Sequence, residues 1–442
     1  MSAASPLKRP RETERPRETR ESGSPASCAS ASSLDHLPSS SPRSPADPLA
    51  AAAVARTRES GSPASCASAG CLDNLPDSSP RLPAGPLAAA AVAWAKGSRP
   101  YMEDRHVIIN DLGTLANGRL DGVEYFSVFD GHGGSRCADY LARDLHVQLV
   151  GDESLTATAD EPTVRASMLR AFAEIDRRFL ESAKIDSIND GATALCVLRR
   201  GCHLDVSNVG DTRAVLGRRR ERGVHPGTPE RAMRERELES VRLSVDHTPN
   251  VLEESERIQG HGGQVKLVNN CWRVMGPTAG PRGAMMLAVS RAFGDKDLKE
   301  SVGLVRQPAH GPPICAAIVF GCLCSSYEFA LLLAPSRLEQ SVHVVQVSCA
   351  PHVLTLRLTS RDQFVILATD GLWDVVGDAE AVRMVERLGR SFQADRGSSR
   401  SVAERVERSQ AAADALLERA LKLGSQDNVT VLVLWLSWDE IN

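Results

Sequence analysis

Short apolar runs separated by polar turns fill the chain from about residue 90 to its end. Runs of β-forming residues predict strands at 91–96, 124–129, 192–198, 203–209, 286–289, 363–368 and 429–436. Helices are predicted at 135–150, 164–179, 378–389 and 401–423, where apolar residues recur at helical spacing. Because only Arg-Arg-Gly-Cys joins the runs 192–198 and 203–209, the pattern favours antiparallel hairpins over a doubly wound parallel sheet.

Residues 1–88 have a different composition, dominated by Ser, Pro, Ala, Arg and Glu. Such a segment cannot bury enough apolar surface to order itself, so we expect a disordered tail. The tail contains a tandem repeat, because the sequence at 19–55 returns at 57–93 with an interval of 38 residues. Two copies are too few for a solenoid, which indicates a duplicated tail segment followed by one folded domain at 89–440.

Bulk composition excludes several classes of function. The net charge of −4 and an aromatic content of 4% give no basis for nucleic-acid binding. The 11 cysteines include no CxxC pair, which is typical of a reduced protein of the cytoplasm or nucleus. The apolar run at 314–323 is too short to span a bilayer, so we expect no membrane partner. We also expect a monomeric protein.

Carboxylates stand at the ends of the predicted strands. Each aspartate taken singly could be only a turn residue, since Asp-Gly and Asp-Thr are common in turns. Together they would repel one another unless hard divalent cations lay between them, and Mg²⁺ and Mn²⁺ prefer such oxygen ligands. The candidates are Asp130, Asp211, Asp295, Asp370 and Asp427, with Glu103 and Asp104 before the second strand run.

Two further residues suit the hydrolysis of a phosphate ester. A pair of metal ions can activate water and clamp a phosphoryl group in line. Arg99 could bind phosphate oxygens, although without the neighbouring carboxylates a surface arginine would be the default interpretation. His132 could protonate a leaving alkoxide or serve only as a structural histidine. The sequence contains neither GxSxG nor a Cys-x5-Arg loop, which disfavours covalent catalysis.

Eight segments together resemble the type-2C protein phosphatases, which depend on magnesium or manganese. They occur in the same order as in the family and cover most of residues 91–437. The amino-acid sequences of these motifs are most similar to those of the plant branch. They are RPYMED (99–104), FSVFDGHGG (126–134), GATAL (191–195), SNVGDTRAVL (207–216), LSVDHTPN (243–250), LAVSRAFGDKDLK (287–299), FVILATDGLWDVV (364–376) and SQDNVTVLVL (425–434).

The resemblance implies an α+β fold, a four-layer sandwich with two central antiparallel sheets flanked by helices. It also implies two Mg²⁺ or Mn²⁺ ions and a weaker third, with phosphoserine and phosphothreonine proteins as substrates. The implied metal residues are Asp130 as the bridge, the Gly131 carbonyl, Asp370 and Asp427, with Glu103 and Asp104 acting through water and Asp211 and Asp295 at the third ion. Arg99 would bind phosphate and His132 would be the general acid.

One segment departs from the family pattern. Residues 307–349 separate two flanks that the family joins by a short connection, and they show no clear period, so we interpret them as an atypical insertion. This leaves a second hypothesis open, a catalytically impaired member that acts as a docking protein. A two-metal nuclease is a third and weaker alternative. No counterpart of the tryptophan-bearing flap of hormone-receptor-regulated members is evident, so we do not expect that regulation.

Overall fold

The computed structural model describes residues 87–221, 237–276, 285–299, 302–303, 342–343, 346–396 and 401–438. The predicted tail, apart from its last two residues, and most of the predicted insertion at 307–349 therefore lie outside the described residues. The described residues belong to one compact unit at 77–442. Among them, no helix is both long and apolar enough to cross a membrane.

One five-stranded sheet, called sheet A, contains the first and the last described strands. Every neighbouring pair in it is antiparallel. Its chain-distant strands β1 and β18 pair along their whole length, so the two ends of the domain are joined. The strand order is β1 (Leu87–Ala95), β18 (Val429–Ser437), β17 (Asp362–Ala368), β8 (Arg213–Arg219) and β9 (Leu238–Arg242).

A second five-stranded antiparallel sheet, sheet B, is built from the middle of the chain. The tight connection predicted after residue 198 is present, because β6 and β7 pair at Arg200↔His203. The strand order is β16 (His352–Arg357), β7 (His203–Val209), β6 (Ala194–Arg200), β3 (Val123–Phe129) and β2 (Arg105–Ile109).

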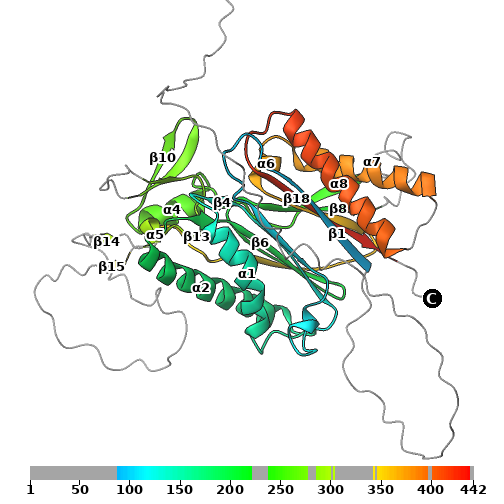
Figure 1. Cartoon of the computed structure of the whole chain (residues 1–442), viewed down its shortest axis with the longest axis horizontal. Helices are drawn as coiled ribbons and strands as arrows, with labels where there is room; N and C mark the ends of the chain where they lie inside the picture. The colour runs from blue at the N-terminus through cyan, green and yellow to red at the C-terminus, as the bar shows by residue number, and fades with distance from the viewer. Residues whose placement is uncertain are drawn as a thin grey trace, which may run out of the picture. The chain divides into compact units, whose positions relative to one another are not determined.

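Two pairs of helices cover the outer faces of the sheets, which makes four layers (Figure 1). Helices α1 (Arg136–Gly151) and α2 (Glu161–Asp186) pack on sheet B, whereas α7 (Asp378–Arg396) and α8 (Val402–Lys422) pack on sheet A. Alternation along β3 shows the principle: Phe126 and Val128 enter the cluster between the sheets, and Tyr125 and Phe129 face α1 and α2. The predicted α+β sandwich is confirmed.

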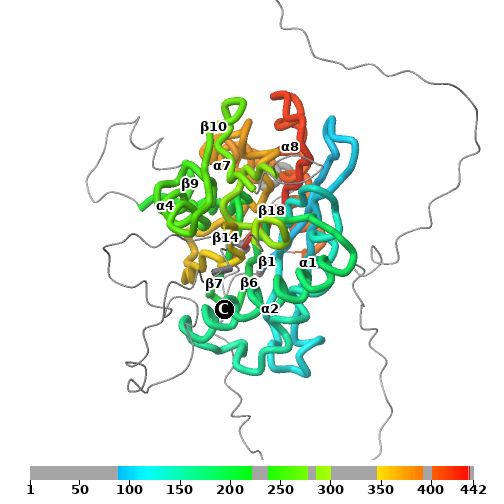
Figure 2. Tube along the Cα trace, turned by 90° about the vertical axis from the view of Figure 1, so that its left-hand side faces the viewer, coloured from blue at the N-terminus to red at the C-terminus, as the bar shows by residue number. Residues whose placement is uncertain are grey.

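Smaller elements gather at one end of the sandwich. A three-stranded sheet of β10 (Gln264–Val268), β11 (Cys271–Met275) and β12 (Met286–Leu287) protrudes there beside α4 (Leu252–Gly260), as Figure 2 shows for β10. The remaining short elements are η1 (Leu112–Thr114), β4 (Gly131–His132), β5 (Gly191–Ala192), β13 (Phe293–Gly294), α5 (Lys296–Lys299), β14 (Val302–Gly303), β15 (Val342–His343) and α6 (Asp370–Trp373).

Element boundaries differ from the predictions in a few places. The run predicted as one strand at 192–198 is divided into β5 and β6, because Gly191 and Ala192 pair with β4 and β13 instead of continuing in sheet B. The run predicted at 286–289 is a strand only at Met286–Leu287. Strands β2, β8, β9, β10, β11 and β16 and helix α4 were not predicted.

Candidate metal centre

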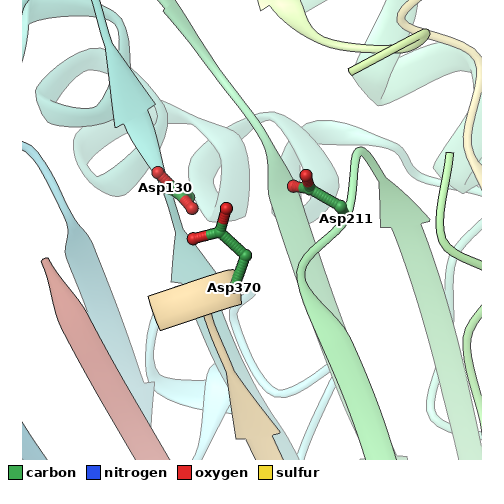
Figure 3. A group of neighbouring side chains, drawn as sticks. All are labelled: Asp130, Asp211 and Asp370. Carbon is green, nitrogen blue, oxygen red and sulfur yellow. The ribbon is translucent and has the colours of Figure 1, made fainter. Parts of the chain in front are cut away.

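Three carboxylates from chain-distant segments converge at one end of the two sheets (Figure 3). Asp130 follows β3, Asp211 lies in the turn between β7 and β8, and Asp370 begins α6 directly after β17. One oxygen of each can be chosen so that all three lie within 4.8 Å of one another. The predicted gathering of aspartates at neighbouring strand ends is therefore present for these three.

Burial and neighbouring negative charges disfavour the ionised form of each of the three aspartates. Burial first, and then the charges of Asp370 and Asp104, raise the pKa of Asp130 well above its usual value. Burial and the charge of Asp370 likewise raise the pKa of Asp211 well above normal. Burial, with the charges of Asp374 and Asp427, raises the pKa of Asp370 to about 6. Ionising three crowded carboxyl groups therefore costs electrostatic free energy, and a bound divalent cation would offset that cost.

Asp104 lies behind this group and carries an unpartnered oxygen. The side chain is 3% exposed, and its Oδ2 accepts hydrogen bonds from the hydroxyls of Thr430 at 2.8 Å and Thr369 at 3.2 Å. Its Oδ1 is buried without a hydrogen-bond partner. Burial and the charge of Asp370 raise the pKa of Asp104 to about 7, although the threonine hydroxyls lower it. An orphan oxygen of this kind fits a water molecule held by a nearby cation.

Asp427 adjoins the group and pairs with Arg99. A guanidinium nitrogen of Arg99 lies 2.5 Å from Asp427 Oδ2, and the arginine side chain is 54% exposed. Asp427 is not one of the three carboxylates that share the 4.8 Å limit, although its charge raises the pKa of Asp370. Arg99 follows β1 and Asp427 precedes β18, and the fold brings these two predicted site residues into contact.

Glu103 is held at the site by its backbone. Its N–H donates to Asn428 Oδ1 at 2.7 Å, and a methyl group at Gly131 would lie 2.5 Å from the Glu103 carbonyl oxygen. The Asn428 amide donates in turn to the carbonyls of Lys96 and Tyr101 at 2.8 and 3.0 Å. Asn428 therefore fixes the segment that presents Glu103, and sequence reasoning missed this role although the asparagine stands next to Asp427.

His132 is paired with Asp295. Its Nε2 lies 2.9 Å from Asp295 Oδ2, and the aspartate side chain is fully buried. Burial lowers the pKa of His132, but the adjoining Asp295 carboxylate outweighs it and raises the pKa above its usual value. A methyl group at Gly191 would lie 2.2 Å from His132 Nε2, so only glycine leaves room for the pair. Asp295 contacts the histidine and is not in the group of three carboxylates, and its place beside a third metal ion stays a prediction.

Asp374 is a further acidic residue that sequence reasoning missed. It is the C-cap residue of α6, four residues after Asp370, and burial and the charge of Asp427 raise its pKa. The sequence signal was present in DGLWD, where two carboxylates one helical turn apart face the same side.

The donor set fits hard divalent cations. The convergent groups are carboxylates, with no His or Cys in the group of three found among the described residues. Such oxygen ligands suit Mg²⁺ and Mn²⁺.

Comparisons with known proteins agree with this geometry. The family model described as Protein phosphatase 2C matches residues 91–429. Mouse "Integrin-linked kinase-associated serine/threonine phosphatase 2C" is 31% identical over 77% of this chain and 70% of its own length. Arabidopsis thaliana "Probable protein phosphatase 2C 59" is 28% identical over 72% of each protein. Animal and plant relatives both match, so the resemblance to the plant branch stays a prediction.

Solved structures support the fold. The serine-threonine phosphatase 2C of Toxoplasma gondii superposes with a TM-score of 0.54 at 22% identity, covering 80% of this chain and 98% of that one. At this identity the likeness concerns the fold alone.

Proposed function

The chain belongs to the protein phosphatase 2C family, and we propose that it hydrolyses phosphoserine and phosphothreonine in proteins at the Asp130–Asp211–Asp370 group. Family membership makes it a metal-dependent serine/threonine protein phosphatase. The observation that carries the assignment of the site is the convergence of three carboxylates whose pKa values are all raised.

The finer proposal is a pair of Mg²⁺ or Mn²⁺ ions with a weaker third. Asp130 would bridge the pair, with the Gly131 carbonyl, Asp370 and Asp427 as further ligands. Glu103 and Asp104 would hold water, which the unpartnered Oδ1 of Asp104 supports. The position of Asp211 beside Asp370 supports a place at the third ion. When bound, such ions lower the pKa of a water molecule and neutralise charge on the phosphoryl group.

Arg99 would bind the phosphate group of the substrate, and His132 would protonate the leaving oxygen. The exposed Arg99 guanidinium can leave or share Asp427 and donate to two phosphate oxygens of the substrate. His132, whose Nε2 faces Asp295, can hold a proton for the serine or threonine oxygen as that oxygen departs. The substrate would be a phosphorylated protein met in the cytoplasm or nucleus by a monomeric enzyme.

The test is dephosphorylation of a phosphothreonine peptide by the purified full chain with MnCl₂ or with EDTA. We expect phosphate release only with the metal, and a loss of at least about a hundredfold in Asp130→Asn. Asp144→Asn is the matched control, because Asp144 pairs with Arg143 on α1 outside the acidic group. Equal activity of Asp130→Asn and the parent would refute the assignment of the site, and activity that persists in EDTA would refute the metal chemistry.

A further inference from the structure

One edge of sheet A is formed by β1, in which six of the nine residues are alanine. In β1, the residues Ala89, Ala91 and Ala93 are each 5% exposed, and Ala93 shares a cluster with Ala412 and Ala413 of α8. The alternate residues Ala88, Ala90 and Val92 pack against the cluster between the two sheets. One face of β1 is therefore buried and the other is partly buried, in both cases through small side chains.

The sequence of this strand occurs twice in the chain. The segment LAAAAVA at 87–93 is identical to LAAAAVA at 49–55, in the first copy of the tandem repeat. Residues 49–55 lie outside the described residues. Every side chain that β1 contributes to the sandwich over this stretch is thus encoded a second time.

The contacts of β1 with α8 do not distinguish the two copies. Ser409 Oγ donates to the carbonyl of Ala89 at 2.8 Å, and Gln410 Nε2 donates to that of Val92 at 3.1 Å. The pairing with β18 from Leu87↔Ser437 to Ala93↔Val431 is also a backbone interaction. Main-chain recognition with small side chains is the mode in which a sheet edge accepts an added strand.

The contacts that distinguish the second copy (87–93) from the first (49–55) are made by residues that follow the shared sequence. Asn428 donates to the Lys96 carbonyl, and Ser98 donates from its N–H to Gln426 O at 3.1 Å. Gly97 has a φ of +60°, and a methyl group there would lie 2.2 Å from the Asp427 carbonyl oxygen. The first copy has Glu59 at the corresponding position, which this close approach excludes.

We propose that the edge position of sheet A is a binding surface for residues 49–55 of the same chain, which can replace β1 there. The linker at 56–86 keeps the first copy at high effective concentration, and the entropy of closing the longer loop grows only slowly with its length. The two occupants differ from residue 94 onward, at Trp94 and Ala95 of β1 and in the contacts of residues 96–99, so weakening the second copy transfers the edge to the first.

The test compares the full chain with three variants in urea unfolding. Ala91→Glu places a charge beneath α8 in the second copy, Ala53→Glu makes the same change in the first copy, and the third variant carries both. Ala413→Glu is the matched control, because it puts the same charge into the same interface from α8, which the chain does not duplicate. Light scattering reports the mass of each variant.

We expect Ala53→Glu to unfold at the midpoint of the parent and Ala91→Glu to keep a cooperative transition with a small shift. The double variant should fall to the low midpoint of Ala413→Glu. Equal midpoints for Ala91→Glu and the double variant, whether high or low, overturn the proposal. A dimer of Ala91→Glu that grows with concentration also overturns it, because the first copy would then serve another chain.

Discussion

Replacing Asp370 with asparagine should make the metal-free protein more stable while removing its response to metal. Burial and the charges of Asp374 and Asp427 raise the pKa of this carboxyl from 3.8 to about 6. A rise of roughly two units corresponds to about 3 kcal/mol between the protonation states. Because the folded-state pKa lies above the unfolded one, this cost is absent below pH 3.8 and complete above about pH 6.

At about pH 7.5, Asp370→Asn should therefore gain up to about 3 kcal/mol in the free energy of unfolding when EDTA is present. The parent should gain stability on addition of MnCl₂, because the ion binds the folded state, and the variant should gain much less. Urea unfolding followed by circular dichroism gives all four values. A variant that is less stable than the parent in EDTA would refute the electrostatic account of the site.

Asp152→Asn is the control of opposite sign. Burial alone raises the pKa of Asp152, but hydrogen bonds from Ser154 and Arg170 outweigh it and lower the pKa to about 2. This carboxylate stabilises the fold above its unfolded pKa, and the contribution is lost as the pH falls through about 2. We expect Asp152→Asn to lose about 1 kcal/mol with or without metal, since the pair lies near the surface.

Other predictions concern pH, the histidine and the glycine beside it. In EDTA, the urea midpoint should rise as the pH falls from about 8 towards 6, because Asp104 and Asp370 take up protons in the folded state. Saturating MnCl₂ should abolish or reverse this trend. Asp295→Asn should lower kcat on a phosphothreonine peptide about tenfold or more but spare p-nitrophenyl phosphate, whose leaving group needs no acid; equal losses on both substrates would contradict the positioning of His132. Gly191→Ala should reproduce that substrate-selective loss, because its methyl group would displace His132, and unchanged peptide turnover would count against the close approach.

Periodicity predicted the interior of the fold better than its edges. The runs of β3, β7, β17 and β18 were found because each combines several apolar residues with burial along almost its whole length. β2 was missed because RHVII is half-buried throughout at a sheet edge, and β10 because its residues are largely exposed. Their strand character comes from pairing with a neighbour, which one segment of sequence does not display.

The site was predictable where strand ends carried the information. Asp130, Asp211 and Asp370 follow apolar runs, and hairpin topology brings such ends to one side. The partnership of His132 with Asp295 was not predictable, because it depends on two side chains meeting over a glycine. Similarly, the anchoring of Glu103 by Asn428 is a tertiary hydrogen bond without a local pattern.

The three clustered aspartates do not all come from one sheet. Asp130 terminates a strand of sheet B, Asp370 follows a strand of sheet A, and Asp211 lies on the crossing between them. The affinity of the site for a cation should therefore depend on the spacing between sheet A and sheet B. A substitution between the two sheets, such as one at Val197 or Leu367, would then weaken ion binding although neither residue belongs to the acidic group.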